Sequence, residues 1–309
     1  MTTDLSGLAG FGLPIVVLLL GGFAYAAWED LREREVPDLL WQGLGVVGFL
    51  VGYVAWVPYG FLSFFLWTVI GLFVLQHLFA WDLRLGPKGE PYADLIELVV
   101  YLLVIVIVVG SVFLFGLGSG GVPVPVVAVL VTVLFARGLF EAGILFGGAD
   151  AKALMIAGLL VPMFPNPLLT LPPSVAPITH YLPFAVNVLM NSALLSVSVP
   201  IAIALRNLHA KEFHGISGFV GYSIPVDDLP RKFVWLRDPM FGEAREEEKT
   251  IETSEDDRRR RESVAKELRE RGVQRVWVTP QIPFLVLMAL GVLGALLAGN
   301  LLFDLIFLL

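Results

Sequence analysis

Long apolar stretches constrain this chain more than any other feature of its sequence. A helix needs about 20 apolar residues to cross a hydrocarbon core of about 30 Å, and most of the stretches reach that length. The chain is 57% hydrophobic and 16% charged, against about 45–50% and about 25% in soluble proteins. We therefore predict an all-α polytopic transmembrane helix bundle of about eight spans, at 8–28, 39–57, 61–80, 95–115, 122–140, 151–164, 182–205 and 281–303.

The basic residues predict how such a bundle is oriented. All 21 lysines and arginines fall in loops or helix ends on one side of it, and cytoplasmic loops are the ones enriched in Lys and Arg. We therefore expect a multi-pass protein of the cell membrane with both termini external. The predicted cytoplasmic segments are 29–38, 81–94, 141–150 and 206–280.

The same charge pattern divides the chain into three parts. Residues 1–205 are predicted to form the membrane bundle, 206–280 a cytoplasmic charged loop or subdomain, and 281–309 the last span. Within the charged segment, "REEEKTIETSEDDRRRRESVAKELRERG" predicts a largely solvated helix or a disordered stretch. We do not expect nucleic-acid binding, because neighbouring Glu and Asp neutralise the arginine run.

The stretch "FGGADAKAL" places Asp150 and Lys152 at the start of a short apolar segment. An ionisable residue at the edge of a hydrocarbon layer indicates a functional site. A helix start there would stabilise the anion of Asp150, and Gly147 and Gly148 would let another backbone come close. For Lys152 two interpretations stay open: it tunes the charge of Asp150, or it extends to lipid headgroups.

A second carboxylate, Asp30, is expected at the same membrane face, in "YAAWEDLREREVPD" at the end of the first span. Two carboxylates that share a site hold one proton between them. One can then activate water while the other donates a proton to a carbonyl oxygen. We predict Asp150 as the base and Asp30 as the acid. By position alone, Asp150 as a simple helix N-cap and Asp30 as a solvated residue remain equally open.

Both aspartate stretches resemble known signatures. "DLREREVPD" and "GGADAKAL" are similar to the two signature stretches of the archaeal preflagellin and type IV prepilin peptidases, relatives of the GxGD intramembrane aspartic proteases. "VWVTPQIPFLVLMALG" resembles the start of the last span in the archaeal enzymes. The resemblance implies that Asp30 and Asp150 are the catalytic pair and that Gly147, Gly148 and Ala149 lead to the second aspartate.

Two features depart from the family pattern. Ala149 stands where strict GxGD has glycine, as a small apolar residue does in archaeal variants of the motif. Four predicted spans also lie between the two aspartates, where a compact six-span archaeal enzyme has two. We interpret the extra pair of spans as an insertion.

The resemblance implies an aspartic endopeptidase that removes the short basic leader of archaellin and type IV pilin-like precursors at the cytoplasmic membrane face. No cofactor is expected, and the surrounding membrane lipid is the other partner. An acidic rim suits a cationic leader, although a merely solvated acidic surface stays open. The rim is formed by Glu29, Glu33 and Glu35.

Two functions of other classes remain as alternatives. One is a secondary transporter or proton-coupled channel that uses Asp30 and Asp150 as ion-binding carboxylates, a class marked by broken helices and sites at the membrane midplane. The other is a membrane scaffold whose segment 206–280 recruits partners.

Overall fold

The chain folds into helices joined by short connections, together with one small sheet. The computed structural model describes residues 9–56, 59–79, 91–118, 120–145, 147–163, 181–236 and 254–308. Most of the predicted cytoplasmic segment 81–94 lies outside these ranges. The chain divides into two compact units, of which unit 1 is Met1–Ala26, Val36–Ser192 and Met288–Leu309, and unit 2 is Ala27–Glu35 and Ala193–Leu287.

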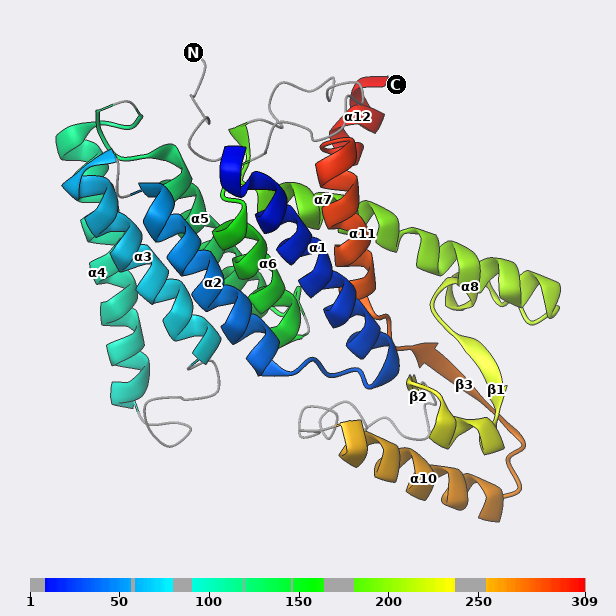
Figure 1. The fold of residues 1–309 in the computed structure, drawn as a ribbon. Helices are drawn as coiled ribbons and strands as arrows, with labels where there is room; N and C mark the ends of the chain where they lie inside the picture. Colours follow the sequence, from blue (N-terminus) through cyan, green and yellow to red (C-terminus); the bar gives the residue numbers. More distant parts are fainter. Residues whose placement is uncertain are drawn as a thin grey trace. The chain divides into compact units, whose positions relative to one another are not determined.

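Unit 1 holds the apolar helices, so the predicted all-α helix bundle is confirmed (Figure 1). Prolines fix two helix starts, Pro91 in α4 and Pro125 in α5, where the missing N–H carries no cost. The helices that lie wholly or partly in unit 1 are α1 (Ala9–Arg32), α2 (Asp38–Trp56), α3 (Phe61–Phe79), α4 (Pro91–Phe115), α5 (Val124–Glu141), α6 (Gly148–Leu160), α7 (Phe184–Ser196), α11 (Phe284–Leu297) and α12 (Leu301–Leu308).

The described residues contain fewer candidate membrane spans than the predicted eight. Six helices there are long and apolar enough to cross a membrane, and α11 with α12 makes a seventh if that bent pair is one span. The remaining predicted span, 151–164, corresponds to α6, which has 13 residues and is too short for this criterion. The six are Gly12–Arg32, Asp38–Ala55, Phe61–Phe79, Leu95–Phe115, Val124–Glu141 and Phe184–His209, the last of which runs through α7 and α8 (Ser198–His209).

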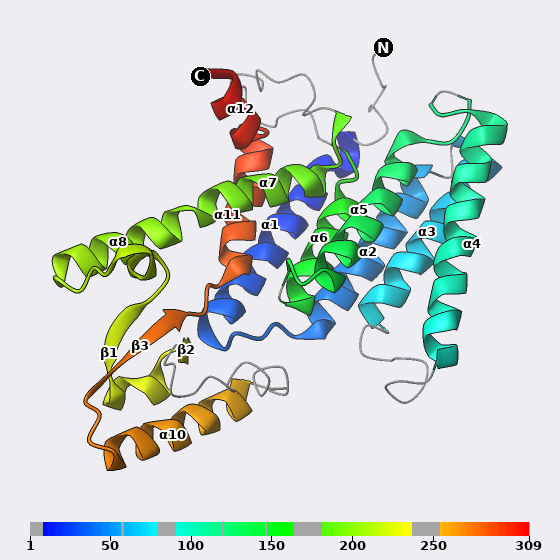
Figure 2. The same ribbon diagram turned by 180° about the vertical axis from the view of Figure 1, so that it is seen from behind.

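Helix α6 is a buried element of the bundle. It packs against α2, α3 and α5, and both ribbon views show α2, α5 and α6 side by side (Figures 1 and 2). Every residue from Ala151 to Leu160 is buried, as expected of a helix that is apolar on all sides. A Cβ atom on Gly158 would come within 2.6 Å of the Thr132 side chain on α5. Such small-residue contacts let membrane helices approach closely.

The last predicted span is broken between α11 and α12, which meet at an angle of 61°. Gly299 at the break has φ +92°. Backbone groups freed inside a membrane must find partners within the protein, and buried asparagines supply them. Asn191 accepts a hydrogen bond from the Leu301 N–H (2.8 Å) and donates one to the Gly299 carbonyl (2.8 Å). Asn300 donates to the Asn187 side chain (2.8 Å).

Unit 2 contains a small domain with a sheet, and the sheet was not predicted from the sequence. Its three-stranded antiparallel sheet has the order β1-β3-β2, so the last strand in the chain lies in the centre. Tyr222 pairs with Val278 and Val234 with Pro280. We call residues 222–236 and 254–280 the polar domain. Its elements are β1 (Tyr222–Pro225), the 3-10 helix η5 (Val226–Arg231), β2 (Val234–Leu236), α10 (Ser254–Glu270) and β3 (Arg275–Pro280), and the 3-10 helix η4 (Gly215–Phe219) packs on α8 outside it.

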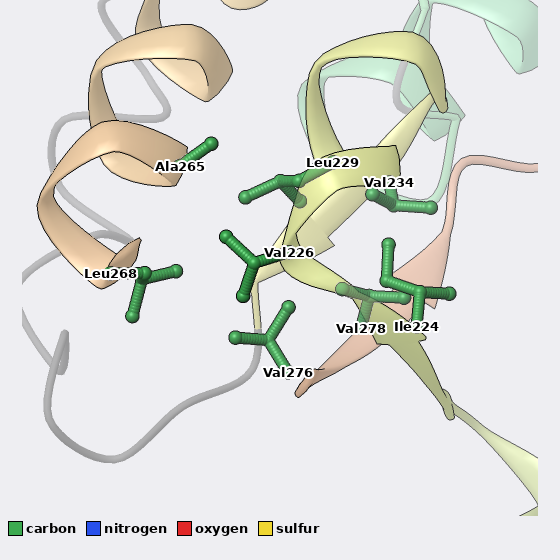
Figure 3. Packing of buried hydrophobic residues seen from close by; sticks show 8 residues of the cluster. All are labelled: Ile224, Val226, Leu229, Val234, Ala265, Leu268, Val276 and Val278. Carbon is green, nitrogen blue, oxygen red and sulfur yellow. The ribbon is translucent and has the colours of Figure 1, made fainter. Parts of the chain in front are cut away.

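The polar domain has a core of its own, in which α10 takes part. Ala265 and Leu268 point from α10 toward Leu229 and Val226 of η5 (Figure 3). The helical alternative predicted for this stretch is therefore correct over 254–270, and one face of this mostly exposed helix is buried. The cluster is formed by Ile224, Val226, Leu229, Val234, Ala265, Leu268, Val276 and Val278.

Candidate active site

Asp30 lies near the end of α1 and belongs to unit 2. Its Oδ2 accepts a hydrogen bond from the Leu285 N–H at 3.1 Å, and its Oδ1 is 3.8 Å from the Arg34 guanidinium. Leu285 is in the first turn of α11, where N–H groups have no partner within the helix. The side chain is only 14% exposed, so Asp30 is not the solvated residue of the alternative interpretation. Both carboxylate oxygens have a positively polarised partner.

Arg34 is held against Asp30 in an unusual backbone conformation. Its φ is +60°, which costs a residue other than glycine about 1–3 kcal/mol and persists only where the surroundings fix it. The guanidinium carbon is 5.1 Å from the centroid of the Phe233 ring, within the range of a cation–π contact. Burial lowers the pKa of Arg34 and the charge of Asp30 raises it, but an arginine stays protonated at neutral pH.

Phe233 connects this cluster to the polar domain. Its ring is also 5.5 Å from the guanidinium carbon of Arg261, a buried residue of α10. Its carbonyl oxygen accepts a hydrogen bond from the Gln281 N–H at 3.0 Å. Segments far apart in the sequence thus meet around one carboxylate. Sequence reasoning missed Phe233 and Leu285, which have no local signal, whereas Arg34 follows Asp30 by only four residues.

Asp150 is the third residue of α6, in unit 1. The N-cap is Gly147, without a side-chain hydrogen bond, so Asp150 is not the N-cap residue of the alternative interpretation. A Cβ atom on Gly147 would lie 3.0 Å from Asp150 Oδ2, a contact that would press on the carboxylate. The φ of Gly147 is −102°, which any residue can adopt. The glycine therefore provides room for the Asp150 side chain.

Lys152 forms an ion pair inside the bundle. Its Nζ is 2.6 Å from Oδ1 of Asp38, in the first turn of α2, and the lysine side chain is 4% exposed. Of the two interpretations left open for Lys152, extension to lipid headgroups is wrong, because the ammonium group is buried against α2. The ion pair joins the first turn of α6 to the first turn of α2.

The acidic residues of the predicted rim flank Asp30. Glu29 is partly buried, while Glu33 and Glu35 are exposed. Glu33 pairs with the neighbouring Arg32 at 3.1 Å, and both side chains are more than half exposed. An exposed pair of this kind contributes little stability, so Glu33 can exchange its partner for a charge on another molecule.

The two predicted catalytic aspartates belong to different units, so their pairing stays a prediction.

Gly148 and Ala149 occupy the first two positions of α6, directly before Asp150. Within the described ranges, no group of three or more His, Cys, Asp or Glu side chains is arranged to hold a metal ion.

Comparison with known protein families gives one match. Residues 216–301 match the family model described as Archaeal Peptidase A24 C-terminus Type II. No curated protein and no solved structure matches the chain. The matched region contains the stretch at 276–291 whose resemblance was noted from the sequence, together with Phe233, Arg261 and Leu285 around Asp30.

The fold and this match indicate a polytopic helical membrane protein with a region similar to the C-terminus of archaeal A24 peptidases. The match supports the archaeal type IV prepilin and preflagellin peptidase family for this chain, in agreement with the resemblance of the two aspartate signatures. A match to a peptidase family suggests proteolysis, and this family implies pilin-like precursors in general as substrates.

Proposed function

We propose that this protein is an aspartic endopeptidase that cleaves the short basic leader from archaellin and type IV pilin-like precursors at the cytoplasmic face of the cell membrane. Asp30 and Asp150 are the proposed catalytic pair. The observation that carries the proposal is the setting of Asp30, whose two oxygens face Arg34 and the Leu285 N–H. Leu285 lies in the region that matches the peptidase family.

The contacts of the two aspartates favour distinct roles. Burial opposes any charge on Asp30, and the Arg34 cation and the Leu285 N–H act against burial by stabilising the anion. Because these two groups are directed at the Asp30 oxygens, we assign the base to Asp30 and the acid to Asp150, the reverse of the roles expected from the sequence.

In this mechanism, Asp30 takes a proton from water while the water oxygen attacks the scissile carbonyl carbon. Asp150 donates its proton to the carbonyl oxygen, which gives a neutral tetrahedral intermediate. The carbon–nitrogen bond then breaks, the leaving amine takes the proton held by Asp30, and the intermediate returns a proton to Asp150. Water is consumed, and the catalytic pair regains its starting protonation.

The transporter alternative gains one observation, the break between α11 and α12. Broken helices in transporters leave carbonyl groups to coordinate ions. In this break, the Gly299 carbonyl accepts a hydrogen bond from Asn191, and the Leu301 N–H donates to the same asparagine. These backbone groups at the break are thus hydrogen-bonded to a side chain of the protein. Peptidase activity remains the better supported proposal.

The test is co-expression of the full chain with a tagged archaellin or pilin precursor, read as a mobility shift on a gel. Asp30→Asn and Asp150→Asn should each leave the precursor uncut at normal protein level, and the double variant should be little worse, because residues that act together are non-additive. Asp227→Asn is the matched control, since Asp227 is exposed and pairs only with the exposed Arg269 in the described contacts. Full processing by either single variant would exclude the aspartic mechanism.

A further inference from the structure

We propose that the polar domain acts on the reaction through Arg34, which Phe233 holds in the position where its charge acts on the Asp30 carboxylate. Arg34 is then a positioning residue for the base, and Phe233 supports it. This inference rests on the proposed function and deepens it, because it gives the polar domain a part in the chemistry.

The first step concerns the Arg34 side chain and the partners of its charge. Its guanidinium is largely buried, and Asp30 is the carboxylate within salt-bridge distance of it in the described structure. Its Nε and Nη1 atoms are buried without a hydrogen-bond partner there. The Phe233 ring therefore stabilises the Arg34 cation in place of a further hydrogen-bond acceptor, because an aromatic face attracts a cation that has lost its water.

The second step concerns how Phe233 is itself held. The residue lies between η5 and β2, and its backbone is tied to Gln281, which follows β3. Its ring centroid is also 5.5 Å from the guanidinium carbon of Arg261, which lies on α10. Because Ala265 and Leu268 of the same helix are in the core of the polar domain, folding of that domain places the ring that Arg34 needs.

The third step concerns the left-handed backbone at Arg34. Strain of this kind tends to collect at functional sites, where the surrounding structure over-determines it. The conformation lets residue 34 turn back toward Asp30 at the end of α1, and asparagine tolerates it better than most other residues with a Cβ atom do. Arg34→Asn therefore removes the cation and preserves the backbone, which makes it the sharpest probe.

The experiment measures precursor processing by the full-length protein in membranes from pH 5 to 9, at matched protein level. Arg34→Asn should lower the rate about tenfold or more and move the acidic limb of the pH–rate profile up by about one pH unit, because a neighbouring cation favours the carboxylate anion. Arg34→Lys should keep most of the profile and lose part of the rate, since lysine keeps the charge but not the planar group. Arg269→Gln, an exposed cation on α10, is the matched control and should change neither quantity.

Variants of Phe233 test separately whether its ring holds Arg34 in position. Phe233→Leu should shift the acidic limb in the same direction as Arg34→Asn, by less, whereas Phe233→Tyr keeps the ring and should behave as the unaltered protein. A purely structural role would reduce the amount of protein and leave the profile per molecule unchanged, and that result in both Arg34→Asn and Phe233→Leu would overturn the inference. If Asp30→Asn itself processes precursor, the proposed function fails instead, so the two failures are distinguishable.

Discussion

Lys152 and Asp38 form an ion pair of 2.6 Å between the first turns of α6 and α2. The lysine is buried, and the aspartate lies at a helix start, where a negative charge is favoured. Lys152 follows Asp150 by two residues, so this pair fixes the turn that carries the second predicted catalytic aspartate. We therefore expect substitution of Asp38 to have a measurable effect.

We expect Asp38→Asn to destabilise the bundle by about 3 kcal/mol, because it removes a charged partner from the buried Lys152 ammonium group. The measurement is thermal unfolding of the purified protein in detergent. Asp38→Asn combined with Lys152→Met should be more stable than Asp38→Asn alone, since no buried charge then remains. Equal stability of Asp38→Asn and the unaltered protein would mean that the ion pair does not hold α6.

Gly147→Ala should reduce processing severalfold without loss of stability. The added Cβ would lie 3.0 Å from Asp150 Oδ2, so the carboxylate must move, while the backbone at φ −102° accepts alanine. The shift is small, but a displaced catalytic group costs rate steeply. Gly138→Ala in α5 is the control, because its new Cβ would meet no atom within 4 Å. Unchanged processing by Gly147→Ala would separate this glycine from the chemistry.

Charge neutralisation tests whether the acidic rim recognises the leader. Replacing the basic residues of a precursor leader by Gln should slow cleavage more than a conservative change in its apolar helix, and added salt should weaken recognition. Glu33→Gln and Glu35→Gln together should reduce the difference between basic and neutral leaders. Cleavage that is indifferent to leader charge would leave the rim as a solvated surface.

The absence of cysteine from the sequence allows a clean test of topology. Tyr181, before α7, and Ile216, after α8, are 79% and 86% exposed and flank the candidate span Phe184–His209. In intact cells, Tyr181→Cys should react with an impermeant thiol reagent and Ile216→Cys should not, because the basic residues follow the span. Reaction at Ile216→Cys alone would invert the predicted orientation.

The sequence predicted those features that repeat along the chain and missed those that join distant segments. Apolar runs located the membrane helices, and small residues before Asp150 indicated the open turn at Gly147. The break at Gly299 was missed because one glycine and one asparagine scarcely alter a long apolar run. The sheet was missed because β1 and β2 have only four and three residues, so their alternation is too short to stand out. The Leu285 contact was invisible because no local pattern encodes it.

The hydrogen bond from Leu285 to Asp30 joins residues 255 positions apart, and this separation has a consequence for biosynthesis. Asp30 leaves the ribosome well before β3, the central strand of the sheet, and the first turn of α11. The nascent chain therefore carries both aspartates without the N–H that later binds one of them until Leu285 has been added. The Asp30 carboxylate becomes fully held only after that point, which delays maturation of the site until the helices before α11 have been delivered to the lipid.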